Sequence, residues 1–334
     1  MVNHESNLMA KLAQAFWTLG TGVGECRSER IASPKASEVL VKTLYSGVSR
    51  GTETLIFKGQ VPTSEHERMR APFQSGSFPG PVKYGYANVG TVVAGDPQWI
   101  GQTVFCLYPH QSHYVVPITA LTRVPPSVPA ARAILAANTE TAINALWDAP
   151  PRVGDRISIV GGGVVGLLLT QLCAQIPGTE VELIDINPER AALAEPFGAR
   201  FATPEQAQLE RDLVFHVSGA PAGLVTALSL AGQEARVVEM SWFGAQDVTL
   251  PLGGSFHSRR LQLISSQVGT INPLQQPRRT YAQRMAQALA LLHDDRLDAL
   301  INAECTLSEL PQQMVALSRK PSSVLCLRVQ YSNP

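Results

Sequence analysis

The sequence has little charge, few aromatic residues and no long apolar run. Charged residues make up 16% of the 334 positions and aromatic residues 6%, whereas an average soluble protein carries roughly 25% charged residues. Lys and Arg together number 27, as do Asp and Glu, so no net charge would attract a nucleic acid or an anionic membrane. No stretch approaches the roughly 20 apolar residues of a transmembrane helix. We therefore expect a small-molecule partner, with no nucleic-acid or membrane partner.

Cysteine is also scarce, and its five positions are scattered. The sequence contains no C-x-x-C pair and no histidine at metal-ligand spacing, which argues against a disulfide framework or a cysteine-bound zinc. The amino terminus lacks the basic segment and apolar run of a secretory signal. These absences predict free thiols in a reducing compartment, and thus a cytoplasmic protein.

The first part of the chain consists of short apolar or alternating runs separated by glycine and proline. This pattern predicts closely spaced strands in an all-β unit, a compact barrel, over residues 1–140. The predicted strands lie at 38–45, 89–93, 103–108 and 113–116, with a long loop from Gly59 to Pro81 and a helix from about Ala130 to Trp147. A loop of that length is usually functional or mobile.

After residue 140 the pattern changes to alternating strands and helices. Apolar runs at 156–160, 181–184, 213–217 and 235–240 alternate with helical segments, which is typical of a parallel sheet with crossover helices. We predict an α/β domain over residues 141–269. Residues 270–334 then contain a helix around Tyr281 to Leu292 and a closing strand from Ser323 to Val329, and we expect them to return to the first domain.

A glycine-rich segment follows the first apolar run of this α/β part. Residues Gly161-Gly162-Gly163-Val164-Val165-Gly166 match G-x-G-x-x-G and precede helix-forming residues. In such a loop Gly161 permits a tight turn, Gly163 lets the backbone approach a pyrophosphate, and Gly166 packs helix against strand. The helix N-terminus at Val164 and Val165 would then face the phosphate charge. The sequence predicts a dinucleotide site; the alternative is a glycine turn without a ligand.

An acidic residue closes the next predicted strand. Asp185 lies 19 residues beyond Gly166, at about the separation of the carboxylate that binds the adenosine ribose hydroxyls. A 2′-phosphate would be repelled there, so we predict NAD, with NADP as the alternative and Arg190 near the adenosine as a complication. Asp185 could instead cap the helix that begins near Asn187.

The order of a β-rich unit, a dinucleotide domain and a C-terminal return strand resembles the medium-chain dehydrogenase/reductase superfamily over nearly the whole chain. The resemblance implies a GroES-like barrel, a doubly wound Rossmann domain and an active site between them. It also places Thr141 and Met240 beside the nicotinamide, Ser218 and Gly219 beside the adenosine half, and suggests a homodimer. The apolar stretches 248–252 and 261–264 could supply its paired edge strands.

The zinc ligands of that superfamily are missing at the matching positions. Ser49 and Tyr86 stand where a metal-binding cysteine and histidine belong, and the structural cysteine quartet is absent. The segments Ser46 to Glu53 and Gly59 to Pro62 resemble the bacteriochlorophyllide dehydrogenase-like branch, although Gly85-Tyr86-Ala87 departs from its G-Y-E. We therefore expect no zinc, because converging Cys, His or carboxylate ligands are lacking.

Without a metal, another group must stabilise the oxygen that gains charge during hydride transfer. Tyr86 is our candidate proton donor, with Ser49 and Thr52 as a hydroxyl relay and Arg50 or Lys83 assisting by charge. Tyr86 could equally be a structural barrel residue, and Ser49 and Thr52 turn residues. We assign no role to the histidines.

These features predict a zinc-independent NAD(H)-linked oxidoreductase that interconverts an alcohol and a carbonyl. An NADPH-dependent enone or quinone reductase is one alternative. A cofactor-binding protein without catalytic turnover is another.

Overall fold

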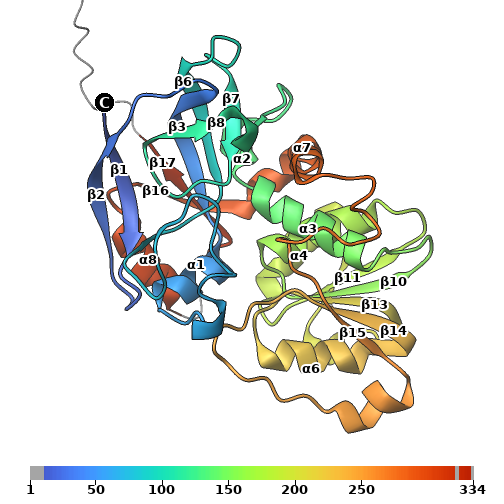
Figure 1. Cartoon of the computed structure of the whole chain (residues 1–334). Helices are drawn as coiled ribbons and strands as arrows, with labels where there is room; N and C mark the ends of the chain where they lie inside the picture. Colours follow the sequence, from blue (N-terminus) through green and yellow to red (C-terminus); the bar gives the residue numbers. More distant parts are fainter. Residues whose placement is uncertain (1–10, 320–322, 332–334) are drawn as a thin grey trace, which may run out of the picture. The chain divides into compact units, whose positions relative to one another are not determined.

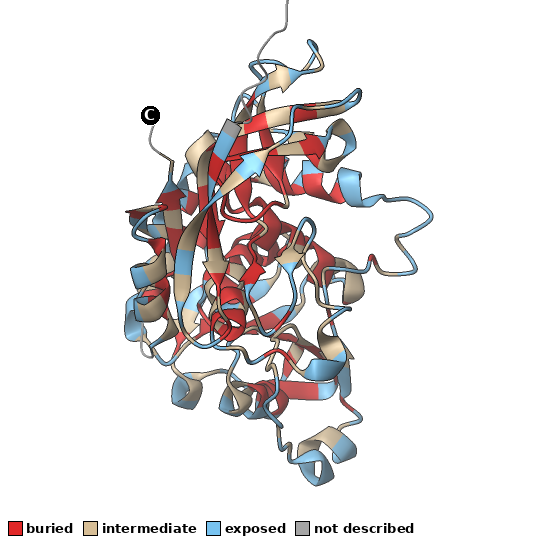
Figure 2. Ribbon diagram, turned by 60° about the vertical axis from the view of Figure 1, so that its left-hand side comes forward, coloured by how far each residue is buried: buried red, intermediate tan, exposed pale blue. Residues whose placement is uncertain are grey.

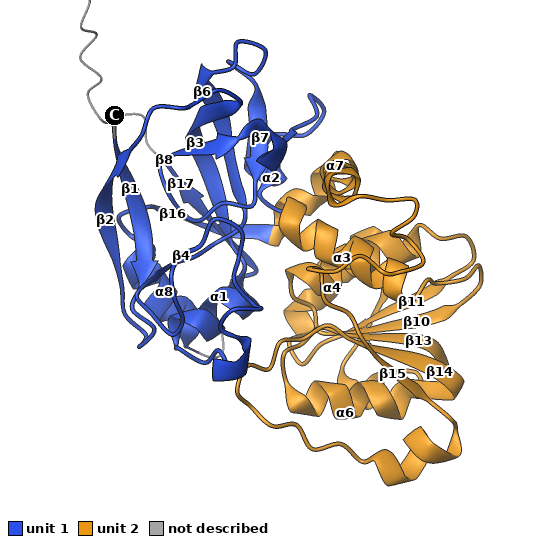
Figure 3. Ribbon diagram, in the orientation of Figure 1, with its two compact units in different colours: residues 1–135, 301–334 blue, residues 136–300 orange. Residues whose placement is uncertain are grey.

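The computed structural model describes residues 11–319 and 323–331, and the chain divides into two compact units (Figures 1 and 3). The first comprises residues 1–135 and 301–334, and the second residues 136–300. The first ten residues of the predicted barrel domain lie outside the described part of the chain. Among the described residues, no helix is long and apolar enough to cross a membrane.

The first unit is built mainly from antiparallel strands. Its strands are β1 (Lys11–Thr18), β2 (Gly24–Ile31), β3 (Glu38–Val48), β4 (Ser75–Gly76), β5 (Val82–Lys83), β6 (Asn88–Gly95), β7 (Thr103–Cys106), β8 (His113–Pro117), β9 (Leu121–Arg123), β16 (Ile301–Thr306) and β17 (Cys326–Gln330). Its helices are α1 (Arg50–Phe57), α2 (Ala130–Ala133) and α8 (Leu310–Ser318), with single turns η1 (Thr63–Glu65) and η2 (Ile118–Ala120). One sheet has the order β2-β1-β5-β4, and the other β16-β17-β3-β6-β7-β9 with β8 paired to β3.

Two apolar clusters hold this unit together. Val39, Val41, Val104 and Tyr114 belong to a cluster between strands of the larger sheet. The other joins the start of the chain to its end, because Phe16, Val48 and Phe57 pack against residues of β17 and α8. This packing explains why the C-terminal segment returns to the first unit.

The second unit is a six-stranded parallel sheet with helices on both faces. Its elements are β10 (Arg156–Val160), β11 (Glu180–Ile184), β12 (Arg200–Ala202), β13 (Arg211–His216), β14 (Ala231–Glu239), β15 (Gln262–Ser265), α3 (Ala136–Asp148), α4 (Val164–Ala174), α5 (Ala191–Ala194), α6 (Pro221–Leu230) and α7 (Tyr281–Leu291). Short helical turns are η3 (Pro188–Arg190), η4 (Glu195–Phe197), η5 (Pro204–Gln206), η6 (Leu252–Phe256) and η7 (Asp295–Leu300).

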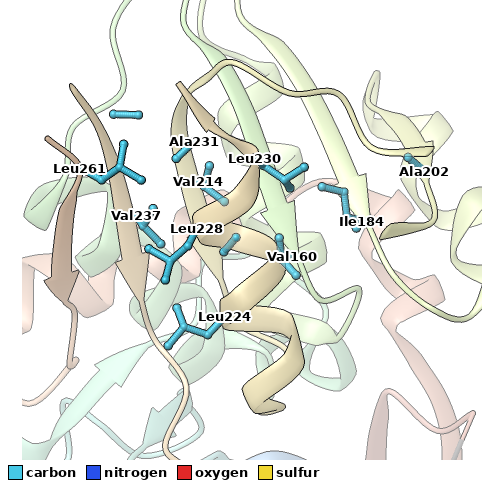
Figure 4. Close-up of a cluster of buried hydrophobic side chains, with 12 residues drawn as sticks. Val160, Ile184, Ala202, Val214, Leu224, Leu228, Leu230, Ala231, Val237 and Leu261 are labelled. Carbon is cyan, nitrogen blue, oxygen red and sulfur yellow. The ribbon is translucent and has the colours of Figure 1, made fainter. Parts of the chain in front are cut away.

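The strand order of this sheet is β12-β11-β10-β13-β14-β15. Helices α3 and α4 lie on one face and α6 on the other (Figure 1). Under α6, Val160, Val214, Val237 and Leu228 form part of a buried cluster (Figure 4). Buried residues follow the strands and the inner helix faces, whereas the connecting loops are mostly exposed (Figure 2). The sheet reverses its order beside β10, which is where ligands bind in doubly wound folds.

The predicted fold class, a GroES-like β unit with a Rossmann α/β unit, agrees with this architecture, but the boundaries differ from 1–140, 141–269 and 270–334. Helix α3 belongs to the second unit from Ala136, and the return to the first unit begins at Ile301 rather than at residue 270. Helix α7 packs on α3 through buried side chains that include an ion pair between Arg284 and Glu140, whose Nε and Oε1 atoms lie 3.0 Å apart. Burial raises the pKa of Glu140, against the opposing effect of Arg284. Residues 270–300 therefore belong to the second unit.

Candidate functional site

The glycine loop lies at the carboxyl end of β10, and α4 begins directly after it. Gly161 has φ +117°, a backbone conformation that residues with a side chain rarely adopt. A Cβ on Gly166 would lie 1.9 Å from the Gly161 carbonyl oxygen, so glycine is required where α4 meets the loop. A Cβ on Gly163 would meet no described atom within 4 Å. Gly163 precedes Val164 as the N-cap of α4, so the open side of the loop faces the start of that helix.

Asp185 follows β11 and fastens the loop from the neighbouring strand. Its Oδ2 accepts the Gly162 N–H at 2.6 Å, and its Oδ1 accepts the Asn187 N–H at 2.8 Å. Arg190 is buried, and its Cγ would lie 3.0 Å from a Cβ on Gly162. The helix-capping role that we considered for Asp185 belongs to Asn187, whose side chain accepts the Glu189 N–H. The structure thus brings the predicted loop, Asp185 and Arg190 together.

The other predicted cofactor residues lie on three elements of the second unit. Ser218 and Gly219 follow β13, and Met240 follows β14, with its N–H donated to the His216 carbonyl at 3.0 Å. Thr141 lies on α3, where its hydroxyl is donated to the Ala137 carbonyl at 3.0 Å. Their roles beside the cofactor stay predictions.

Ser218 belongs to a group of three hydrogen-bonded side chains, together with His216 and Glu239, that the sequence did not predict. The buried His216 ring contacts Ser218 Oγ through Nε2 at 2.7 Å and Glu239 Oε2 through Nδ1 at 2.6 Å. His216 and Glu239 are register partners on neighbouring parallel strands. Because they are distant in sequence, only the strand register could have revealed the pairing.

A cluster of hydroxyl groups lies at the start of α1 in the first unit. Ser49 is the N-cap of that helix and Thr52 lies in its first turn. Both hydroxyls hydrogen-bond the phenol of Tyr86, which follows β5 in the chain. Burial and, to a smaller extent, the nearby charge of Glu53 raise the pKa of Tyr86 to about 12, against the lowering effect of the hydrogen bonds with Ser49 and Thr52. The phenol therefore stays protonated at neutral pH, and it is a weaker acid than a free tyrosine.

The two cations that we considered as helpers of Tyr86 have other contacts. Arg50 donates from Nη1 to the Val324 carbonyl at 3.0 Å, which ties α1 to the C-terminal segment. Lys83 is buried, and its Nζ lies 2.6 Å from Glu29 Oε2 and 2.6 Å from Gln111 Oε1. Lys83 therefore neutralises Glu29. The structure joins Tyr86 to Ser49 and Thr52, but it directs both cations toward other partners.

Behind the hydroxyl cluster lies a buried chain of polar side chains. Glu53 Oε1 accepts the Ser49 N–H at 2.7 Å, and its Oε2 lies 2.8 Å from His110 Nε2. His110 Nδ1 lies 2.7 Å from Ser46 Oγ, which in turn lies 2.8 Å from the Tyr331 hydroxyl. Sequence reasoning gave His110 no role, since its partners are 57 and 64 residues away. No local motif signals such a chain.

Ser49 and Tyr86 stand at the metal-ligand positions of the superfamily. Across residues 11–319 and 323–331, no group of three or more His, Cys, Asp or Glu side chains could hold a metal ion. Glu53 and His110, which lie near these positions, hydrogen-bond each other. The side chains around Tyr86 offer hydroxyl groups, which are poor zinc ligands compared with thiolate, imidazole or carboxylate.

The loop fits a nicotinamide dinucleotide in its chemistry. The open side of Gly163 and the first N–H groups of α4 suit a pyrophosphate, and Asp185 is a hydrogen-bond acceptor at the end of the adjoining strand. The residues that would hold the cofactor are therefore Gly161 to Gly166 with Asp185.

Comparisons with known proteins agree with this architecture. No protein-family model matches the sequence. L-idonate 5-dehydrogenase from Escherichia coli superposes with a TM-score of 0.79 at 15% identity, over 96% of this chain and 99% of that one. A protein from Sinorhizobium meliloti described as a zinc-binding dehydrogenase, bound to NADP, superposes with a TM-score of 0.76 at 18% identity, over 96% and 99% of the two chains.

A curated enzyme also matches part of the sequence. Galactitol 1-phosphate 5-dehydrogenase of Escherichia coli is 30% identical over 93 residues. This match spans 24% of the present chain and only 27% of the length of that enzyme. The structural superpositions, in contrast, cover nearly both whole chains. The chain therefore has the fold of the medium-chain dehydrogenase/reductase superfamily, a GroES-like unit joined to a Rossmann unit.

Proposed function

We propose that the protein is a zinc-independent, NAD(H)-linked oxidoreductase that interconverts an alcohol and a carbonyl on a small molecule. The observation that carries this proposal is the glycine loop, fastened by the 2.6 Å hydrogen bond from Gly162 to Asp185 at the strand-order reversal of the sheet. Gly166 lets α4 pack closely against the loop, and Gly163 leaves the side of the loop next to the start of that helix open. A tight glycine turn that leads from a strand into the N-terminus of a helix is the usual geometry of a pyrophosphate site.

The proposal gives the first unit the acid–base part of the reaction. A bound nicotinamide supplies or accepts the hydride. Tyr86 then donates its phenolic proton to the carbonyl oxygen during reduction, and receives it back during oxidation. Ser49 and Thr52 hold the phenol by hydrogen bonds and orient it. Zinc independence rests on the donor set, because Ser49 and Tyr86 stand where the superfamily has metal ligands.

The preference for NAD rests on Asp185. Its carboxylate would accept hydrogen bonds from the adenosine ribose hydroxyls and would repel a 2′-phosphate. The Sinorhizobium meliloti relative binds NADP, and Arg190 packs against Gly162, so the NADPH-dependent enone or quinone reductase is the second candidate. We further propose a cytoplasmic location, since all five cysteines are free thiols.

Titration with NADH and with NADPH, followed by fluorescence, tests the cofactor assignment. We expect NADH to bind at least tenfold more tightly, and tighter binding of NADPH would favour the second candidate. A panel of polyols, ketones and enones, followed by the absorbance of NADH, then tests the reaction. Tight NADH binding without turnover on any carbonyl would indicate a cofactor-binding protein that does not catalyse.

A further inference from the structure

We propose that His216 and Glu239 are positioning residues of the dinucleotide site, and that their hydrogen bonds hold the turns after β13 and β14 in the shape that receives the cofactor. This role rests on the cofactor binding of the proposed function. It depends neither on Tyr86 nor on the reaction in the first unit, because all of its contacts lie within the second unit.

The His216–Glu239 pair lies at the edge of the sheet that carries the glycine loop. His216 is the register partner of Val160, the last residue of β10, and of Glu239 at the end of β14. The backbone after His216 touches the loop directly, because a Cβ on Gly161 would lie 2.6 Å from the Ser218 nitrogen. A displacement of Ser218 would therefore clash with the loop or leave the loop without this contact.

The pair bonds both turns through its polar atoms. His216 Nδ1 lies 2.6 Å from Glu239 Oε2, and His216 Nε2 lies 2.7 Å from Ser218 Oγ. Glu239 Oε1 accepts the Ser241 N–H at 2.6 Å. One assignment of hydrogens satisfies these contacts: with a neutral imidazole, Nδ1–H donates to the carboxylate and Nε2 accepts the Ser218 hydroxyl. Each member of the pair therefore holds one turn.

The two turns are also joined to each other and to α6. Ser241 Oγ accepts the Gly219 N–H at 3.1 Å. Ser218 Oγ accepts the N–H of Ala220, the N-cap residue of α6, at 3.2 Å. Gly223 lets the first turn of α6 close over this network, because a Cβ there would lie 2.3 Å from Ser218 Oγ and 2.8 Å from the imidazole Nε2. The Ser218 hydroxyl is therefore used within the protein.

The pair is buried more deeply than the turn that it holds. His216 is 0% exposed, and its ring lies nearly parallel to that of Phe243, with centroids 6.0 Å apart. Ser218 and Gly219 are exposed. A Cβ on Gly219, which has φ +67°, would meet no described atom within 4 Å. An exposed turn that borders open space and is fixed from behind by buried hydrogen bonds is preorganised for a ligand, which lowers the entropic cost of binding.

The two turns are the predicted seats of different halves of the cofactor. The superfamily resemblance places Ser218 and Gly219 beside the adenosine half, and Met240 beside the nicotinamide. Because His216 bonds Ser218 and Glu239 bonds the residue after Met240, one pair holds both seats. Loss of the pair should therefore weaken binding of the whole dinucleotide more than binding of AMP, which fills the adenosine seat alone.

Two substitutions at Glu239 differ in the hydrogen bonds that they keep. Glu239→Met is similar in size and removes all of them. Glu239→Gln keeps an acceptor for the Ser241 N–H and offers an N–H to His216 Nδ1, whose tautomer then reverses. We expect Glu239→Met to weaken NADH binding about tenfold and AMP binding by a smaller factor, and Glu239→Gln to weaken NADH binding by at most about threefold. Fluorescence titration with NADH and calorimetric titration with AMP measure these affinities.

A milder variant and a matched control complete the set. Ser218→Ala removes the hydroxyl that bonds His216, and it should weaken NADH binding about threefold. Ser158→Ala on β10 removes a buried hydroxyl that has no hydrogen-bond partner among the described residues, and it should bind NADH as the wild type does. This comparison decides the matter even where Glu239→Met does not fold.

Melting temperatures of the same proteins separate positioning from stability. A lower melting temperature with wild-type NADH affinity in Glu239→Met and Ser218→Ala would overturn the positioning role, as would equal losses of affinity in Glu239→Met and Glu239→Gln. A wild type that binds NADH but reduces no carbonyl would overturn the proposed reaction and not this role. A wild type that binds neither NADH nor NADPH would overturn both.

Discussion

The Asp185 carboxylate accepts the backbone N–H of Gly162 at 2.6 Å. The second carboxylate oxygen accepts the Asn187 N–H at 2.8 Å. One side chain therefore shapes the phosphate loop and also presents a negative charge at the end of β11. Under the proposed function this residue serves both cofactor selection and loop geometry, and a variant that tests selection must remove the charge with little change to the loop.

Asp185→Asn removes the charge, and its single amide oxygen can still accept one of the two backbone N–H groups. We expect NADPH to bind about tenfold more tightly relative to NADH than in the wild type, which corresponds to about 1.4 kcal/mol. Fluorescence titration with both cofactors measures the ratio. A ratio that stays at the wild-type value would show that the Asp185 charge does not select against the 2′-phosphate.

Substitutions at two glycines of the loop test helix packing and ligand binding separately. Gly166→Ala places a Cβ 1.9 Å from the Gly161 carbonyl, so we expect a large loss of stability together with loss of NADH binding. Gly163→Ala meets no described atom within 4 Å, so the fold should keep its melting temperature while NADH binding weakens at least tenfold. Calorimetry and titration compare the two. Wild-type NADH affinity in Gly163→Ala would place the phosphates elsewhere.

The raised pKa of Tyr86 predicts a pH dependence of stability. In the unfolded chain the phenol ionises near pH 10, whereas the folded-state pKa is about 12 because of burial and the charge of Glu53. This contribution is fully present below pH 10 and is lost as the pH rises from 10 to 12. The wild type should therefore lose about 1 kcal/mol relative to Tyr86→Phe between pH 9 and 11. Denaturant unfolding of both proteins at these pH values measures the difference, and parallel curves would contradict the assignment.

The edge of the parallel sheet suits a homodimer, which we propose from the superfamily resemblance. Strand β15 is the last strand of the sheet, and Leu263 on it is 38% exposed. Val248 and Leu250 of the other expected stretch pack instead against the cluster of Figure 4. We expect Leu263→Lys to sediment as a monomer, and the control Leu274→Lys, at a more exposed loop position, as a dimer. A monomeric wild type at micromolar concentration would refute the dimer.

The parts of the fold that sequence could predict are those with local signals. The glycine loop, β10 and Asp185 lie within about 30 consecutive residues, and their spacing reflects the geometry of one strand, turn and helix. The predicted single helix from Ala130 to Trp147 is two helices, α2 and α3, which belong to different units. Helix propensity along the sequence does not show where the chain passes from the core of one unit to the core of the other.

The unpredicted features depend on residues that are distant in sequence. Arg284 keeps residues 270–300 with the dinucleotide unit through Glu140, 144 positions away. The contact between Ser46 and Tyr331 spans 285 positions. Lys83 was a reasonable helper for Tyr86 by proximity in sequence, yet its side chain pairs with Glu29 on β2. A single sequence indicates which side chains lie at turns, but only the folded structure shows which side chains they hydrogen-bond or pair with.

The most direct test of the account is NADH-dependent carbonyl reduction by protein freed of metal with a chelator, with zinc content determined by elemental analysis. We predict that the metal-free wild type oxidises NADH with a carbonyl substrate. Tyr86→Phe should bind NADH normally but turn over about 10² to 10⁴ times more slowly. Activity that appears only after zinc is restored, or full activity in Tyr86→Phe, would contradict the proposal.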